Sequence, residues 1–310
     1  MSIPVAAQAP PVEVRRDVQY ATAGGVPLLL DAYVPTPAGA LRPAVVLLHG
    51  GGWRVGDKAS FATEAQQLAA RGWVAFSVNY RLTEPEAFPA EVDDLVAAVR
   101  WVRANGGAYG VDPARIGALG ESAGGHLAAL LGTLGDGDLS SGARIRVGVA
   151  WSGPMDLAAL ARSRGEGWSS RLLACTPDGC PDRWAQASPP THVDASDAPF
   201  LLVNSTDELV PLTQAETMAG RLRAAGVDQR LDVLPGTRHA LDYRADAWPA
   251  TAEFLARYLD PPPAAAGGSD TDGGSGSLLM VLAGAAVVVV VGGAVARRRR
   301  PADQARNQSV

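Results

Sequence analysis

A glycine-framed serine, Gly120-Glu121-Ser122-Ala123-Gly124, constrains the fold of this chain more than any other stretch. It fits the pattern G-x-S-x-G, in which a serine occupies a sharp turn between a strand and a helix and its crowded backbone requires small neighbours. The pattern by itself is weak, because glycine and serine are common. Its setting strengthens it: residues 115–119 are typical of a short buried strand, and the residues after Ser122 are rich in Ala and Leu, as in a helix. The sequence therefore predicts strand, turn and helix, with the Ser122 hydroxyl exposed at the turn.

Composition divides the chain into five segments. Residues 12–260 alternate strand-like and helix-like patterns and are expected to form one domain. Residues 1–11 are expected to be a disordered start or the remnant of a signal peptide. Residues 261–277 are a Pro/Gly/Ser-rich linker that cannot build a core, residues 278–296 are apolar, and residues 297–310 form a basic tail.

Within residues 12–260 a hairpin-like start precedes repeated strand–helix units. Continuous apolar runs predict buried parallel strands, at Ala44–Leu48, Val74–Tyr80, Arg115–Leu119, Val147–Trp151, Pro199–Asn204 and Arg230–Leu234. Helices are predicted at Phe61–Ala70, Val92–Asn105, Ala123–Gly132, Thr213–Ala225 and Ala245–Leu259. This alternation predicts an α/β fold, a mostly parallel sheet flanked by helices. Residues 155–197 break the rhythm, and we expect them to form a small cap or lid.

The run Leu278–Ala296 carries no charge and is followed by four arginines. A helix of that length spans about 28 Å, close to the hydrocarbon thickness of a bilayer, so we expect one membrane-spanning helix. The arginines predict a cytoplasmic tail and an extracytoplasmic location for residues 12–260. Ala7-Gln8-Ala9 resembles a signal-peptide cleavage site, which suggests that the start lies upstream. The alternative is a cytoplasmic, tail-anchored protein.

The net charge and the two cysteines indicate which binding partners, which cellular compartment and which metal sites to expect. A net charge of −5 argues against a nucleic-acid partner. Cys175 and Cys180 flank the turn-forming residues Pro177-Asp178-Gly179. We expect a disulfide across this turn, which is typical of an oxidising compartment; two free thiols are the alternative. No histidine stands at a zinc-ligand spacing from these cysteines, so no metal site is expected.

A glycine-rich loop, His49-Gly50-Gly51-Gly52-Trp53, directly follows the predicted strand Ala44–Leu48. Glycines let bare backbone N–H groups approach a substrate oxygen that gains negative charge in acyl transfer. Gly51 and Gly52 are the expected donors, with the N–H of Ala123 as the third. A phosphate loop is disfavoured because no Gly-Lys-Ser/Thr follows. We expect His49 to anchor the loop.

A serine nucleophile needs a base, and the base needs an orienting acid. On a strand–turn–helix scaffold of this kind the chain order is serine, acid, histidine. Asp207, which follows the predicted strand Pro199–Asn204, is the first choice for the acid, and Glu208 is the second. His239 is the only histidine downstream and follows the predicted strand Arg230–Leu234. The predicted triad is Ser122, Asp207 and His239.

These stretches together resemble the α/β-hydrolase superfamily, and within it the HGGG-type carboxylesterases of the hormone-sensitive-lipase-like and feruloyl-esterase-like branches. Further residues that carry the resemblance are 111–116, Ser188-Pro189-Pro190 and Asp207–Pro211. It covers most of residues 12–260 and implies hydrolysis of a small-molecule carboxylic ester with no metal or organic cofactor. Glu121 departs from the Asp common in the lipase-like branch, which favours the feruloyl-esterase-like or peptidase-like branches. A peptidase or formamidase-like amidase on the same fold, and a non-catalytic binding module, are the alternatives.

Overall fold

The computed structural model describes residues 9–83, 87–165 and 167–260. The chain divides into two compact units, Met1–Pro263 and Ala264–Val310, and every described residue belongs to the first. Within the described part, no helix has both the length and the apolar character needed to cross a bilayer. The predicted linker 261–277, spanning helix Leu278–Ala296 and tail 297–310 lie outside the described residues.

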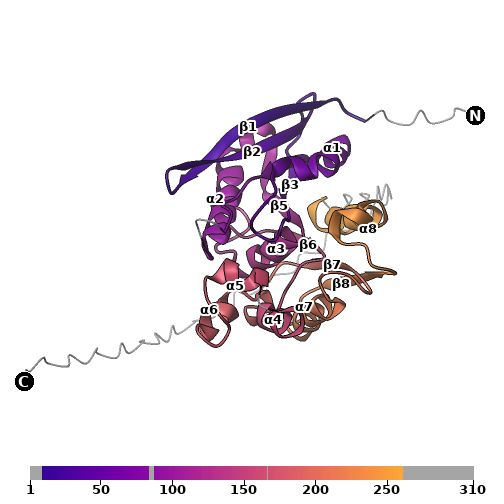
Figure 1. The fold of residues 1–310 in the computed structure, drawn as a ribbon. Coiled ribbons are helices and arrows are strands. Elements are labelled where there is room, and N and C mark those ends of the chain that lie inside the picture. The colour runs from indigo at the N-terminus through magenta and orange to yellow at the C-terminus, as the bar shows by residue number, and fades with distance from the viewer. Residues whose placement is uncertain (1–8, 84–86, 166, 261–310) are drawn as a thin grey trace, which may run out of the picture. The chain divides into compact units, whose positions relative to one another are not determined.

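The domain is built on one eight-stranded sheet in the order β1-β2-β4-β3-β5-β6-β7-β8 (Figure 1). The strands are β1 (Val12–Ala23), β2 (Val26–Pro35), β3 (Arg42–Leu48), β4 (Val74–Val78), β5 (Val111–Glu121), β6 (Val147–Trp151), β7 (Phe200–Ser205) and β8 (Gln229–Leu234). β1 and β2 form the predicted hairpin, and β2 runs antiparallel to β4. From β4 to β8 all neighbours are parallel. The prediction of a mostly parallel sheet is confirmed.

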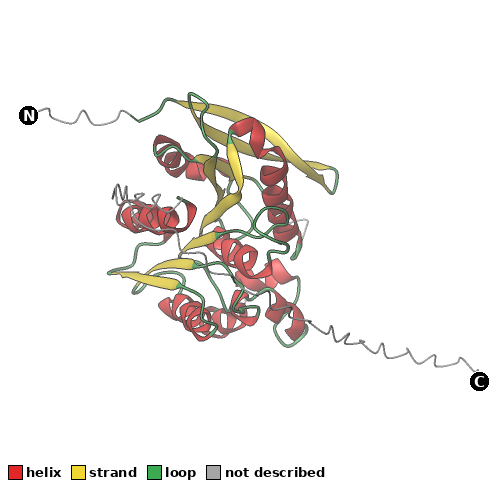
Figure 2. Cartoon of the chain, turned by 180° about the vertical axis from the view of Figure 1, so that it is seen from behind, coloured by secondary structure: helices red, strands yellow, loops and turns green. Residues whose placement is uncertain are grey.

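Helices cover both faces of this sheet, and Figure 2 shows the strands running between them. The helices are α1 (Ala62–Ala70), α2 (Ala90–Asn105), α3 (Ala123–Leu134), α4 (Leu157–Arg164), α5 (Gly167–Leu173), α6 (Pro181–Gln186), α7 (Leu212–Ala224) and α8 (Arg244–Leu259). All five predicted helices are present. The interval 155–197, predicted as a cap, contains the three short helices α4, α5 and α6; we call it the cap segment.

The core has two layers because successive strand side chains point to opposite faces. In β3, Val46 and Leu48 join the layer under α2, α3 and α7, while Val45 and Leu47 join the layer under α1 and α8. All four side chains are fully buried. Apolar residues on both faces are the reason that this strand is a continuous hydrophobic run in the sequence.

The parallel strands end at one edge of the sheet, and the candidate residues follow them there. The glycine-rich loop follows β3, Ser122 follows β5, residues 206–210 follow β7 and His239 lies five residues after β8. The carboxyl edge of a parallel sheet is where open α/β folds place their ligand sites. The topology therefore brings residues that are up to 190 positions apart to one place.

Candidate active site

Ser122 occupies the strained turn that its glycine frame predicts. Its backbone has φ 51° and ψ −119°, between the end of β5 and the first residue of α3. A Cβ on Gly124 would lie 1.9 Å from the carbonyl oxygen of Leu48, and one on Gly120 would lie 2.1 Å from the carbonyl of Gly124. The Ser122 N–H donates to the carbonyl of Trp151 at 2.7 Å. Close packing of this turn against β3 and β6 thus holds the serine in a conformation that non-glycine residues rarely adopt.

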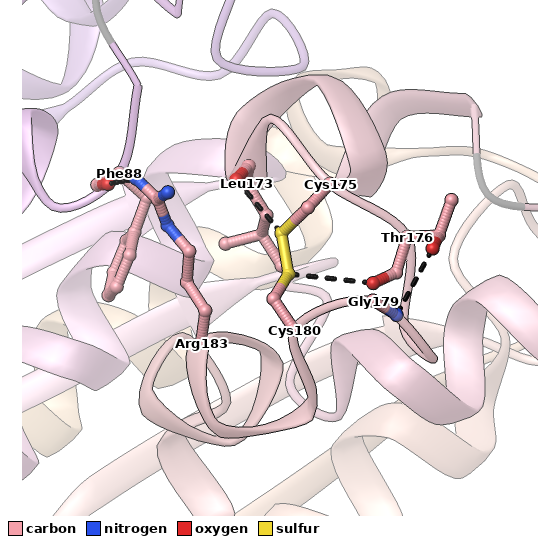
Figure 3. The surroundings of a disulfide bond; sticks show 7 residues. All are labelled: Phe88, Leu173, Cys175, Thr176, Gly179, Cys180 and Arg183. Carbon is pink, nitrogen blue, oxygen red and sulfur yellow. Dashed lines mark hydrogen bonds between the residues drawn. A yellow bond between two sulfur atoms is a disulfide. The ribbon is translucent and has the colours of Figure 1, made fainter. Parts of the chain in front are cut away.

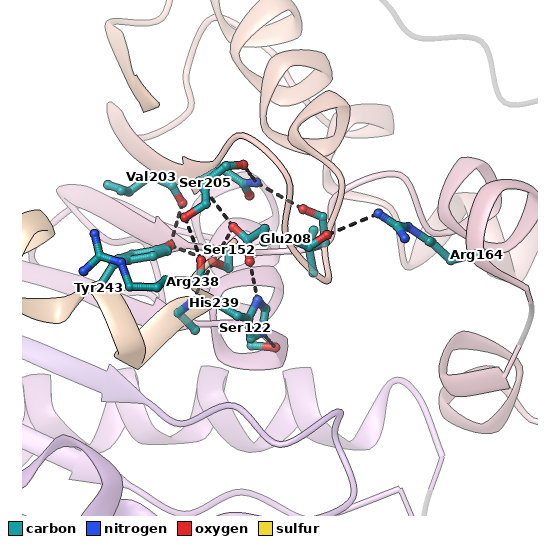
Figure 4. A network of polar contacts seen from close by, with 12 residues as sticks. Ser122, Ser152, Arg164, Val203, Ser205, Glu208, Arg238, His239 and Tyr243 are labelled. Carbon is teal, nitrogen blue, oxygen red and sulfur yellow. Dashed lines mark hydrogen bonds and ion pairs between the residues drawn. The ribbon is translucent and has the colours of Figure 1, made fainter. Parts of the chain in front are cut away.

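His239 bridges Ser122 and a carboxylate. Its Nε2 lies 3.0 Å from Ser122 Oγ, and its Nδ1 contacts Oε2 of Glu208 (Figure 4). Asp207, the first choice from the sequence, does not contact the imidazole: its side chain is exposed, and its N–H donates to the carbonyl of Gly236 at 3.0 Å. The prediction of Asp207 is therefore wrong, and Glu208, the second choice, holds that position. The turn after β7 buries the side chain of Glu208 and leaves the side chain of Asp207 exposed.

Glu208 is fixed on its other oxygen as well. Oε1 accepts hydrogen bonds from the Ser205 N–H and from Ser152 Oγ, each at 2.8 Å. The Glu208 carboxylate is completely buried, so these donors replace the water that an ionised group would otherwise require. Its backbone carbonyl accepts from the Arg164 guanidinium at 3.2 Å, which ties α4 of the cap segment to this loop (Figure 4).

Ser152 is a functional residue that the sequence reasoning missed. It follows β6 with φ 50° and is fully buried. Besides contacting Glu208, its Oγ accepts from the Ala240 N–H at 2.9 Å and lies 2.7 Å from the hydroxyl of Tyr243. Burial raises the pKa of Tyr243, so this hydroxyl stays neutral. Ser152 thereby joins the acid to the loop of the histidine; its only signal in the sequence is its position directly after a strand.

The glycine-rich loop lines the cavity beside Ser122. Gly51 and Gly52 have φ values of 106° and 61°, in the left-handed region that favours glycine. Neither N–H makes a hydrogen bond to the described residues. Ala123 is the first residue of α3, where helix geometry leaves the N–H without an intrahelical acceptor. The three predicted donors thus belong to one cavity wall with Ser122.

Two side chains hold this loop against the sheet. Glu121 Oε1 accepts from the Gly50 N–H at 2.6 Å; burial raises the pKa of Glu121, and the Gly50 hydrogen bond opposes that rise. His49 stacks on Tyr80 with ring centroids 4.3 Å apart, and burial lowers its pKa. Its Nδ1 lies 2.8 Å from the carbonyl of Gly50. His49 therefore supports the loop, as predicted, while His239 contacts the serine.

The cavity has a volume of about 630 Å³ and a mostly apolar lining. Ser122 and His239 lie in its wall, and the apolar residues that line it include Trp53, Val55, Leu160, Trp168, Leu209 and Val210. Trp168 belongs to α5 of the cap segment and is 49% exposed. The cap segment therefore contributes to the cavity in which a substrate would meet the serine.

The cap segment is fastened next to α2. Cys175 and Cys180 form the predicted disulfide (Figure 3). The Phe88 N–H donates to the carbonyl of Leu172 at 2.9 Å, and the Arg183 guanidinium donates to the carbonyl of Phe88. These contacts fix α5 and α6 on both sides of the disulfide. In the described ranges, no group of three or more His, Cys, Asp or Glu side chains could hold a metal ion.

Known proteins resemble this chain in sequence and in fold. The sequence model of the BD-FAE family matches residues 30–222. Esterase LipC of Mycobacterium tuberculosis is 32% identical over 238 residues, which are 70% of this chain and 58% of LipC. The chain spans little more than half the length of the curated relatives that it matches over the longest stretches.

Solved structures extend the similarity. The acetyl ester-xyloside bifunctional hydrolase from Caldicellulosiruptor lactoaceticus has 29% identity and a TM-score of 0.64, over 74% of this chain and 85% of its own. Esterase Est2 of Thermogutta terrifontis has 26% identity and a TM-score of 0.66, over 82% of this chain and 95% of its own. With the family match, the sheet order and the serine turn, the chain belongs to the BD-FAE family of the α/β-hydrolase superfamily.

Proposed function

We propose that this protein is a serine hydrolase of carboxylic esters that acts through Ser122, His239 and Glu208. One observation carries the proposal: the imidazole of His239 joins the Ser122 hydroxyl, 3.0 Å away, to a buried carboxylate. A serine hydroxyl is a weak nucleophile unless a base removes its proton, and this arrangement supplies the base and orients it. The apolar cavity around the serine accommodates the carbon skeleton of an ester.

In the first half of the reaction, His239 Nε2 takes the Ser122 proton while Oγ bonds to the ester carbonyl carbon. The carbonyl oxygen becomes negatively charged, and the N–H groups of Gly51, Gly52 and Ala123 stabilise it. Loss of one such donor typically lowers kcat by about 10²–10³-fold. Glu208 holds the proton of His239 on Nδ1, so that Nε2 is free to accept, and stabilises the imidazolium that forms.

In the second half, the tetrahedral intermediate collapses. The bond to the alcohol oxygen breaks, the Nε2 proton moves to that oxygen, and an acyl group remains on Ser122. Water then attacks the acyl carbon while His239 takes a proton from it, and the carboxylic acid leaves as Oγ recovers its hydrogen. Ser122, His239 and the three N–H donors that carry out these steps line the same cavity.

The names of the relatives support ester chemistry: LipC and Est2 are named esterases, and a second mycobacterial relative is named a probable carboxylic ester hydrolase. The test is hydrolysis of p-nitrophenyl acetate and butyrate by the full chain in detergent. Ser122→Ala is expected to lower kcat by at least about 10⁴-fold, whereas Ser196→Ala, at an exposed serine, is expected to leave it unchanged. If the protein cleaves amides but no ester, the proposal is wrong and the protein is an amidase or a peptidase.

We also propose that the chain is anchored in a membrane by Leu278–Ala296, with its catalytic domain outside the cytoplasm. The uncharged apolar run followed by four arginines supports this orientation, and the disulfide fits an oxidising compartment. Protease added to intact cells is expected to release the catalytic domain by cutting the linker 261–277. Complete protection, with cutting only after lysis, would place the domain in the cytoplasm.

A further inference from the structure

His126 is a buried histidine that no step of the proposed reaction uses. It lies on α3 one turn after the nucleophile, and its backbone N–H donates to the carbonyl of Ser122 at 3.1 Å. Its side chain is fully buried, with 0% exposure. Both ring nitrogens are nevertheless engaged, each by a different element of the fold, so the imidazole is more than a space-filling group.

The first contact reaches the glycine-rich loop. The indole Nε1–H of Trp53 donates to Nδ1 of His126 at 3.2 Å, and the two rings meet edge to face at 5.2 Å. Indole nitrogen is only a donor, so Nδ1 must accept and the ring proton must sit on Nε2. The Trp53 carbonyl is held separately, by the N–H of Thr83 at 2.8 Å and its hydroxyl at 2.9 Å.

The second contact reaches the cap segment. Nε2–H of His126 donates to the carbonyl of Ala187 at 2.7 Å, directly after α6. The next residue, Ser188, accepts from the Leu157 N–H at 3.1 Å and so connects this point to α4. One neutral imidazole therefore joins the helix of the nucleophile, the loop of the oxyanion donors and the cap segment.

We propose that His126 is a positioning residue that couples the cap segment to the oxyanion donors through its two ring nitrogens. The coupling acts on Gly52 because Trp53 follows it in the chain: fixing the indole fixes the peptide planes that carry the N–H donors. The inference rests on the proposed esterase function. Burial lowers the pKa of His126 to about 4, so the neutral ring that both contacts require is the form present at pH 7.

Three variants distinguish the effect of losing each His126 hydrogen bond from the effect of changing the packing around the ring. Trp53→Phe keeps an aromatic ring but removes the N–H donor. His126→Asn keeps an acceptor near Nδ1, and His126→Gln reaches the position of Nε2 with a donor. His192→Asn is the matched control, because His192 lies in the same cap segment and its Nε2 lies 2.7 Å from the carbonyl of Gln186, outside the site.

The measurement is kcat and KM for p-nitrophenyl acetate with the full chain, together with the inhibition constant of a boronic acid that mimics the tetrahedral intermediate. Misplaced N–H donors stabilise the transition state less well but leave substrate binding nearly unchanged. Trp53→Phe is therefore expected to lower kcat about 10- to 100-fold, with KM within about twofold of the wild-type value. Boronic acid affinity is expected to fall in parallel with kcat/KM. His126→Asn and His126→Gln are each expected to lose part of kcat, and His192→Asn none.

A double-mutant cycle gives the deciding result. If His126 acts through Trp53, the effects of Trp53→Phe and His126→Gln on kcat are strongly non-additive. Additive effects, or folded variants with kcat within about twofold of the wild type, would overturn the inference. Should the His126 variants fail to fold, Trp53→Phe is measured alone, and a kcat and a boronic acid affinity both within about twofold of the wild type would overturn the inference. A wild type inactive on every ester would instead count against the proposed function.

Discussion

Glu208→Gln is the substitution that most sharply separates the two neighbouring acids after β7. The carboxylate contacts His239 through Oε2, while Oε1 accepts from the Ser205 N–H and from Ser152 Oγ, each at 2.8 Å. Two donors require an acceptor at the Oε1 position, so a glutamine would place its amide oxygen there and its NH₂ group toward Nδ1. That group forces Nδ1 to accept, which moves the ring proton to Nε2, where it blocks proton transfer from Ser122.

A histidine held in the wrong tautomer typically lowers kcat by about 10⁴-fold, or about 5.4 kcal/mol in activation free energy. We expect that loss for Glu208→Gln, with KM nearly unchanged. The matched control is Asp207→Asn, which removes the same charge one residue earlier from an exposed side chain; its kcat should stay within about threefold of the wild type. The assay is p-nitrophenyl acetate hydrolysis, normalised to folded enzyme. A large loss in Asp207→Asn and near-normal activity in Glu208→Gln would refute this reasoning.

Three further perturbations follow from local geometry. Gly124→Ala places a Cβ 1.9 Å from the Leu48 carbonyl and should destabilise the fold by at least about 2 kcal/mol in urea unfolding, whereas Gly220→Ala, on an open helix position, should be neutral or stabilising; equal stabilities would contradict this. Burial raises the pKa of Glu91 from 4.5 to about 7, so the folded chain keeps a proton that the unfolded chain releases, and stability falls as pH rises through this interval. Glu91→Gln has no carboxyl group to titrate, so its free energy of unfolding relative to that of the wild type should increase between pH 5 and pH 8. A difference between the two free energies that does not change with pH would refute this prediction. Trp168→Ala should lower kcat/KM for hexanoate more than for acetate, because the indole lines the cavity, and an equal effect on both esters would argue against this contact.

The fold was largely predictable because a parallel strand that is buried on both faces has apolar residues at successive positions, and such a run can be recognised in the sequence. β6 has the predicted bounds, Val147–Trp151, and α8 begins one residue before its predicted start. β5 is longer than predicted, since Val111 already pairs with Arg42 before the apolar run begins. Strand edges depend on partners that local sequence does not reveal.

The site was predictable where backbone geometry restricts the residue type. Gly124 and Ser122 belong to a crowded turn with a recognisable pattern, and His239 has no competitor downstream of the candidate acids. The choice between Asp207 and Glu208 was not predictable, because adjacent residues in a turn point in different directions and only the tertiary structure decides which is buried. Ser152 follows an ordinary strand, and only its contacts reveal its role.

The central claim is that Ser122 is a nucleophile activated by His239 and Glu208. Labelling the full chain with a fluorophosphonate and locating the adduct by peptide mass spectrometry tests it most directly. We expect one adduct, on Ser122, formed much more slowly in Glu208→Gln and at the wild-type rate in Asp207→Asn. An active enzyme that acquires no adduct on Ser122, or that is labelled equally fast without the Glu208 carboxylate, would contradict the claim.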